Sequence, residues 1–268
     1  MKKLLILLLV SFGIISCQQK SEPEKKSISI HSEILNEERI CLIDLPDSYN
    51  DPDEPGHSYP VLILLDGETF FKTTSGIVHF MSSGTNRNYF MPETIIVAIE
   101  NVDRERDFTI TKIKTTRPNT MGGGKHFLKF IENELLPYLD KNYRTQASRT
   151  LVGHSLGGLL TVNAYLDENS MFDNFLAIDP SLWWDEATML EKIENTDPRC
   201  FEKRLYIATA NQGEKNEGKN KLRHERFYKG ILATGNSMNI THNYWENEDH
   251  RSVPLPAIYE GLRYLNAE

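Results

Sequence analysis

The chain has 268 residues, with 30 Lys or Arg against 38 Asp or Glu, and a formal net charge of −8 at pH 7. This length suits one large α/β domain or two small ones, and a hydrophobic content of 39% is ordinary for a protein with a substantial core. No basic stripe stands out, so the acidic balance argues against a nucleic-acid partner.

The first residues read as an export signal rather than as part of a fold. Met1-Lys2-Lys3 is basic, and the apolar run over residues 4–15 is too short to span a bilayer comfortably. The run ends in Ile14-Ile15-Ser16-Cys17, which resembles the lipobox of bacterial lipoproteins. By that resemblance, residues 1–16 are a signal peptide and Cys17 carries lipid, so the protein is exported and anchored in the cell envelope. A plain secreted protein and an uncleaved anchor are the alternatives.

The polar residues that follow Cys17 have no apolar pattern and are expected to be a tether, giving a second segment over residues 17–26. Residues 27–268 then form one catalytic domain. Two further cysteines, Cys41 and Cys200, remain in it. Export permits a disulfide between them, but two separate buried thiols are favoured. No Cys/His spacing indicates a metal site.

The first half of this domain begins with two expected strands, residues 27–34 and 39–45, which read as a hairpin at one edge of a sheet. Residues 59–65 form a continuous apolar run, typical of a strand buried on both faces, and a loose helical stretch follows around residues 70–81. Residues 94–99 are another buried strand. Residues 101–114 are charged and without periodicity, which predicts a long loop.

The strongest helical pattern follows three consecutive glycines, with Phe127, Ile131 and Leu135 at i, i+4 and i+8. Pro137 is expected to kink or end this helix. From there strands and helices alternate. Strands are expected over residues 149–152, 175–178, 204–210 and 240–245, and helices over 156–166, 187–193, 219–232 and 255–265. This order predicts a mostly parallel sheet with helices on both faces and an antiparallel N-terminal edge.

The pattern Gly-x-Ser-x-Gly occurs between an expected strand and an expected helix, in Gly153-His154-Ser155-Leu156-Gly157-Gly158. That is the spacing of a nucleophile elbow, in which a serine sits on a sharp strand-to-helix turn and its hydroxyl stands clear of the sheet. The backbone passes close to its neighbours there, so glycine is needed on either side of the serine.

A serine hydroxyl needs a base and an oriented imidazole to act as a nucleophile. In the α/β-hydrolase order the acid and then the histidine follow the serine. His250 is preferred because it lies just beyond the last strand, whereas His224 is expected on a solvated helix face and His242 lies inside a strand. Glu214 is the first choice for the acid, Asp179 the second and Asp249 the third, since each of the first two lies near the end of a strand.

An oxyanion hole requires two backbone N–H groups near Ser155. Leu156 is expected to supply one, and Gly67 or Glu68, after the strand over residues 59–65, the other.

Taken together, Leu65-Asp66-Gly67, Arg106-Asp107-Phe108-Thr109, the elbow and His250-Arg251-Ser252-Val253-Pro254 resemble an esterase group of α/β-hydrolases. That group includes esterase D, ferric-enterobactin esterases and several feruloyl and acetylxylan esterases, and the resemblance covers nearly the whole chain after the tether. It implies the α/β-hydrolase fold, a triad of Ser155, His250 and Glu214, and carboxylic-ester hydrolysis without a metal or organic cofactor.

The resemblance also implies that Arg104 and Arg106 line the substrate cleft, although an ion pair between Arg106 and Asp107 that braces the loop is an equal alternative. Trp183 and Trp184 are expected either to stack on an aromatic or sugar group or to pack as a lid. The expected substrates are siderophore or other phenolic esters, or carbohydrate-linked esters. An acyltransferase on the same fold and a non-catalytic binding lipoprotein remain the alternatives.

Overall fold

The computed structural model describes residues 26–53, 55–84, 87–167, 170–185, 191–213, 219–235 and 239–267. One sheet of eight strands runs through these residues in the order β1-β2-β4-β3-β5-β6-β7-β8. β1 and β2 pair antiparallel, β2 joins β4 antiparallel, and every later pairing is parallel. The strands are Lys26–Ser32 (β1), Glu37–Asp44 (β2), Tyr59–Leu64 (β3), Ile95–Ile99 (β4), Thr145–His154 (β5), Asn174–Ile178 (β6), Arg204–Ala210 (β7) and Ile240–Trp245 (β8). The mostly parallel sheet with an antiparallel N-terminal edge is confirmed.

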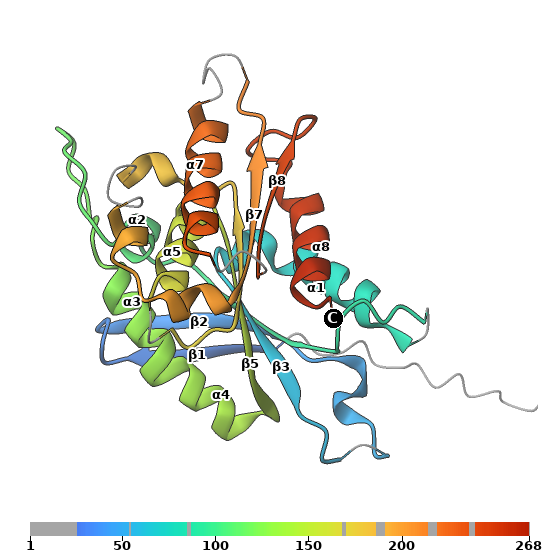
Figure 1. Cartoon of the computed structure of the whole chain (residues 1–268). Helices are drawn as coiled ribbons and strands as arrows, with labels where there is room; N and C mark the ends of the chain where they lie inside the picture. The colour runs from blue at the N-terminus through green and yellow to red at the C-terminus, as the bar shows by residue number, and fades with distance from the viewer. Residues whose placement is uncertain are drawn as a thin grey trace, which may run out of the picture.

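Side chains that alternate along the central strands divide the core into two layers. In β3, Val61 and Ile63 belong to one apolar cluster, and Leu62 and Leu64 belong to the other. Helices cover both layers, with α1 and α8 on one face and α3, α4, α5 and α7 on the other (Figure 1). The helices are Gly67–Ser82 (α1), Arg104–Phe108 (α2), Gly124–Phe130 (α3), Leu136–Asn142 (α4), Leu156–Tyr165 (α5), Lys219–Ala233 (α7) and Pro254–Leu265 (α8).

The structure contradicts one expectation about local structure and narrows another. The segment over residues 101–114 is not a continuous loop, because Asp103 accepts a hydrogen bond from the N–H of Arg106 and caps the short helix α2. Pro137 was expected to kink or end its helix, and the helix does not end there. The chain continues from α3 through a π-helical turn, Ile131–Leu135, into α4, and the wider turn lies where the proline nitrogen has no hydrogen to donate.

His224 lies in the core, not on the solvated face that the charge of its helix suggested. Its side chain is fully buried, and the buried positions of α7 are Asn220, His224, Phe227 and Ile231. Those positions are spaced by four, three and four residues, which is the spacing of one helix face. The burial of His224 therefore has a sequence signal that its charged neighbours obscured.

The two cysteines of the described chain are buried thiols and form no disulfide, as favoured from the sequence. Cys41 lies on β2, where burial raises the pKa of its thiol to about 12. At neutral pH this thiol is therefore protonated and unreactive.

Candidate active site

Ser155 sits on the turn between β5 and α5. Its backbone has φ 60° and ψ −116°, a strained conformation for a residue with a side chain, and its N–H donates to the carbonyl of Ile178 at 3.0 Å. Gly153 is required two residues earlier, because a Cβ there would lie 2.3 Å from the carbonyl oxygen of Gly157. Gly157 has less need to be glycine, since its own Cβ would meet neighbours at an ordinary 3.4 Å. The strand, strained serine and helix form the predicted elbow.

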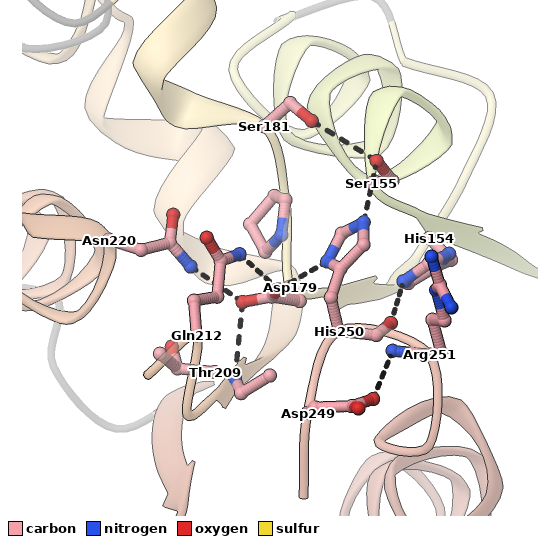
Figure 2. Close-up of polar contacts among 12 residues, drawn as sticks. His154, Ser155, Asp179, Ser181, Thr209, Gln212, Asn220, Asp249, His250 and Arg251 are labelled. Atoms are coloured by element: carbon pink, nitrogen blue, oxygen red, sulfur yellow. Dashed lines mark hydrogen bonds and ion pairs between the residues drawn. The ribbon is translucent and has the colours of Figure 1, made fainter. Parts of the chain in front are cut away.

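His250 lies in the turn after β8 and faces the serine. Its Nε2 is 3.1 Å from Ser155 Oγ, and its Nδ1 is 2.5 Å from Asp179 Oδ2 (Figure 2). A carboxylate accepts hydrogen bonds only, so Nδ1 carries the proton and donates it to Asp179. In the neutral form of the ring, Nε2 is the unprotonated nitrogen and accepts from the hydroxyl of Ser155, which is the arrangement a general base needs.

Among the described residues, the carboxylate that contacts His250 is that of Asp179, the second candidate for the acid. The first choice was Glu214. Glu214 lies outside the described residues. Asp179 follows β6 with a φ of 38°, and its side chain is fully buried beneath His250. The single proton on Nδ1 is bonded to Asp179, so Asp179 is placed where an acid that orients the ring would lie. Asp249, the third candidate, instead accepts from the backbone N–H groups of Arg251 and Ser252.

Four hydrogen bonds hold the carboxylate of Asp179. Oδ1 accepts from the N–H of Ala210 at 3.1 Å and from Asn220 Nδ2 at 2.7 Å, and Oδ2 accepts from Gln212 Nε2 at 2.7 Å as well as from His250. Burial raises the pKa of this carboxyl, whereas the hydrogen bonds from His250, Gln212 and Ala210 lower it, and the resulting pKa is below its ordinary value. Asp179 is therefore ionised at neutral pH.

Two more residues contact the triad and were not singled out from the sequence. Ser181 Oγ lies 3.3 Å from Ser155 Oγ, and because the hydrogen of Ser155 points to His250, Ser181 is the donor of this pair. His154 Nε2 is 2.8 Å from the carbonyl oxygen of His250, and the two rings lie 4.4 Å apart between centroids. Burial, and then the proximity of His250, lower the pKa of His154 to about 4, so it is neutral and donates through Nε2.

The triad opens into a cleft of about 770 Å³. Arg104, Arg117 and Arg251 line it together with Trp183 and Trp184. Both tryptophans therefore border the cleft, but in different ways. Trp183 is 49% exposed, whereas Trp184 is 6% exposed and donates its Nε1–H to the carbonyl of Thr111 at 3.3 Å. Trp183 is the ring available for stacking, and Trp184 packs in the wall.

The two arginines predicted to line the cleft have separate places. Arg104 does line it, and its guanidinium bonds both carboxylate oxygens of Asp66, at 2.6 and 3.0 Å, and the carbonyl of His154 at 3.1 Å. Arg106 is not among the residues of the cleft. It bonds Asp107 at 2.7 Å and Glu37 at 2.6 and 3.1 Å. The ion pair with Asp107 that the alternative expected is present, and the cleft role of Arg106 stays a prediction.

The proposed oxyanion donors lie at the first residues of two helices that follow neighbouring strands. α1 begins at Gly67 after β3, α5 begins at Leu156 after β5, and these two strands are neighbours in the sheet. A Cβ on Gly67 would lie 2.9 Å from the backbone of Ala98 and Ile99, so only glycine fits there. Arg104 joins the two helix starts by bonding Asp66 and the His154 carbonyl. The role of Gly67 and Leu156 as oxyanion donors stays a prediction.

Within the described part of the chain, no group of three His, Cys, Asp or Glu side chains is arranged to hold a metal ion. A search of the same residues for a helix long and apolar enough to cross a membrane finds none. Residues 1–25, including Cys17, lie outside the described residues.

The sheet order, the elbow and the serine, histidine and aspartate in contact define an α/β-hydrolase fold. Comparison with known sequences gives the family. The sequence model described as "Putative esterase" matches residues 32–220, and the chain belongs to that family.

Among curated relatives, the ferri-bacillibactin esterase BesA of Bacillus subtilis is 29% identical over 156 residues, which are 53% of this chain and 54% of the relative. The siderophore triacetylfusarinine C esterase of Aspergillus fumigatus is 31% identical over 142 residues, 50% of this chain and 48% of the relative. The chain thus matches about half the length of these relatives. Among solved structures, an IroE-like serine hydrolase from Shewanella oneidensis has a TM-score of 0.81 at 32% identity, over 91% of this chain and 80% of that one.

Proposed function

We propose that this protein is a serine carboxylic-ester hydrolase that works through an acyl-enzyme intermediate, with Ser155 as nucleophile, His250 as base and Asp179 as acid. The observation that carries the proposal is the continuous contact from Asp179 through His250 to Ser155, at 2.5 and 3.1 Å, beside the cleft of about 770 Å³. Membership of an esterase family supports it. The same contact favours catalysis over binding alone, because a binding protein has no need of it.

In the proposed acylation step, Ser155 Oγ attacks the ester carbonyl carbon while its proton passes to His250 Nε2. Asp179 holds the imidazole in the tautomer that can accept this proton and stabilises the imidazolium that results. Ser181, which donates toward Ser155 Oγ, faces the oxygen on which charge changes. Collapse of the tetrahedral intermediate breaks the ester C–O bond, and His250 gives the proton to the leaving alcohol.

In deacylation, a water molecule takes the place of the alcohol. His250 removes one proton from it as it attacks the acyl carbon. The bond between the acyl carbon and Ser155 Oγ then breaks and His250 returns the proton to Ser155 Oγ, so that a carboxylic acid leaves and the enzyme is restored. In both steps a negative charge forms on the former carbonyl oxygen. The N–H groups of Leu156 and Gly67 are proposed to stabilise that charge.

For the substrate, we propose siderophore or other phenolic esters ahead of carbohydrate-linked esters. An exposed indole, that of Trp183, and the guanidinium groups in the cleft suit an aromatic ligand with negative charge or many oxygen atoms. The named activities of the two curated relatives favour the same order.

The test is hydrolysis of p-nitrophenyl butyrate by the purified protein, followed by a comparison of a catecholate siderophore lactone, a feruloyl ester and an acetylated oligosaccharide. Release of p-nitrophenol that disappears in Ser155→Ala is expected. Wild-type rates in Ser155→Ala would refute the proposed mechanism. Product analysis with added carbohydrate acceptors separates the hydrolase from an acyltransferase, because a transferase forms the acylated sugar in place of the free acid.

We also propose export and lipidation at Cys17, on the basis of the sequence alone. Radiolabelled palmitate added to growing bacteria should label the full-length protein and fail to label Cys17→Ser. Equal labelling of both proteins would rule out lipidation at this residue.

A further inference from the structure

Two side chains on one face of α7 form hydrogen bonds with the segment Asp179-Pro180, which carries the proposed acid. Asn220 and His224 are one helical turn apart, so they point the same way. Asn220 Nδ2 donates to Asp179 Oδ1 at 2.7 Å, and His224 Nε2 lies 2.7 Å from the carbonyl oxygen of Pro180. The helix therefore forms hydrogen bonds both with the carboxylate of Asp179 and with the carbonyl of the next residue, Pro180.

His224 is itself held at its other nitrogen. Its Nδ1 lies 2.6 Å from Thr209 Oγ1, and Thr209 Oγ1 lies 2.8 Å from His242 Nε2. The Pro180 carbonyl can only accept, so His224 Nε2 carries a proton. Burial lowers the pKa of His224, so the ring is neutral and its Nδ1 is an acceptor.

These constraints fix the direction of each hydrogen bond in the series that links His242, Thr209, His224 and Pro180. Thr209 has one hydroxyl hydrogen and must give it to His224 Nδ1. Its oxygen is then free to accept from the Nε2–H of His242. The order is His242 to Thr209, Thr209 to His224, and His224 to Pro180, with each group donating to the next. All three side chains belong to β7, β8 or α7, which are regular elements of the fold.

The segment Asp179-Pro180, which accepts the last of these hydrogen bonds, has a strained backbone. Asp179 has a φ of 38°, in the left-handed region that residues with a Cβ avoid. Such a conformation is costly for a residue with a side chain and persists only where the surroundings hold it. The N–H of Asp179 donates to the carbonyl of Ala208 at 2.7 Å, and the Pro180 carbonyl is held by His224, so one contact lies on each side of the strained residue.

We propose that His224 is a positioning residue for catalysis. By holding the Pro180 carbonyl, it keeps Asp179 in the strained conformation that presents the carboxylate to His250 Nδ1, and Thr209 with His242 keeps His224 in the tautomer that this contact requires. His224 does not act on the substrate itself, because its side chain is fully buried and it is not among the residues of the cleft. This inference rests on the proposed function of the triad, but its geometry can be tested without turnover.

The decisive pair of variants is His224→Asn and His224→Gln. Glutamine places an amide N–H near the position of Nε2 and can still donate to Pro180. Asparagine is shorter, so it keeps a partner for Thr209 but cannot reach Pro180. A displacement of about 1 Å in a catalytic group can cost on the order of 100-fold in rate. We expect kcat for p-nitrophenyl butyrate to fall by roughly that factor in His224→Asn with KM unchanged, and glutamine to restore most of it.

A second readout needs no substrate. The proton between His250 Nδ1 and Asp179 should give a far-downfield ¹H NMR resonance, assigned by its loss in His250→Ala. In His224→Asn this signal should broaden or move upfield, and in His224→Gln it should stay. Circular dichroism shows whether each variant is folded. If His224→Asn does not fold, Thr209→Val tests the same series of hydrogen bonds. Valine keeps the side-chain shape and removes the hydroxyl that fixes the His224 tautomer.

An unchanged downfield signal and an unchanged kcat in a folded His224→Asn would overturn the inference, as would an equal loss in the asparagine and glutamine variants. Failure of the proposed function looks different. A wild-type protein without esterase activity, or an active Ser155→Ala, would refute the serine hydrolase assignment and leave the NMR comparison to decide the role of His224.

Discussion

The carboxylate of Asp179 accepts the Nδ1–H of His250 at 2.5 Å, while the same side chain is fully shielded from solvent. A buried carboxylate in this position fixes which ring nitrogen carries the proton, and so leaves the other nitrogen free to act as the base. In the proposed mechanism, this contact decides how the serine is activated.

This contact predicts a large difference between two carboxylate variants. Asp179→Asn should lower kcat by about 10³- to 10⁴-fold with little change in KM, because the imidazole then loses its orienting acceptor and adopts the wrong tautomer. Glu214→Gln, the matched change at the acid first expected from the sequence, should stay within about threefold of wild type. Steady-state kinetics on p-nitrophenyl butyrate measure both. The reverse order of losses would return the acid's role to Glu214.

Ser181 predicts a smaller effect on the same step. Its hydroxyl donates toward Ser155 Oγ from 3.3 Å, so Ser181→Ala removes a partner of the nucleophile without changing the backbone. We expect kcat to fall by roughly tenfold, corresponding to about 1.4 kcal/mol, a typical value for one hydrogen bond. Ser181→Thr, which keeps a hydroxyl, is the control. Equal activity in the alanine and wild-type proteins would remove Ser181 from the mechanism.

Arg104 and Arg106 should differ in what they affect. Arg104 bonds both oxygens of Asp66 and borders the cleft, so Arg104→Lys loses the two-pronged contact and should lower kcat/KM by roughly 10- to 100-fold. Arg106 ties α2 to Glu37 on β2. Arg106→Gln should leave KM unchanged and lower the free energy of unfolding by about 1 kcal/mol.

Kinetics and urea unfolding on the same two preparations separate these effects. A KM change in Arg106→Gln would place that residue back in the cleft. A loss of stability without any kinetic change in Arg104→Lys would make Arg104 a structural residue alone.

Stability should fall on mild acidification because of two half-buried imidazoles. Burial and a neighbouring histidine lower the pKa of both His154 and His242 to about 4, against 6.5 in the unfolded chain. The unfolded state therefore binds more protons between these values, so this stability is complete above pH 6.5 and is lost as the pH falls toward 4. Between pH 6.5 and 5 each imidazole should cost about 2 kcal/mol, at about 1.4 kcal/mol per pKa unit.

Urea unfolding at pH 7, 6 and 5 measures how steeply the free energy of unfolding falls with pH. His242→Gln should flatten this slope by roughly the share of one imidazole, because glutamine can still donate to Thr209 and does not titrate. A slope that is identical in wild type and His242→Gln would contradict the assignment of His242.

The sequence alone was enough to find a candidate residue wherever neighbouring residues formed a recognisable pattern. Ser155 could be found because the elbow is a pattern of six adjacent residues, and His250 because it follows a recognisable last strand. The acid could not be chosen in this way. In the sequence, Asp179 and Glu214 each follow an expected strand. The contact of Asp179 with His250 depends on the positive φ of Asp179 and on α7, a helix that begins some forty residues later. His224 was wrongly expected on a solvated face, because the charged residues around it were given more weight than the spacing it shares with Phe227 and Ile231.

The packing of Pro180 against the nucleophile's helix has a consequence for how sequences of this kind can diverge. A Cβ added at Gly158 would lie 3.0 Å from Pro180 Cα, so the first turn of α5 and the acid's segment fill one shared space. A larger residue at position 158 would push directly on the peptide unit that carries Asp179. Tolerated changes at positions 158, 180 and 224 should therefore occur as coordinated sets, and libraries that vary one of these positions alone should yield few active clones.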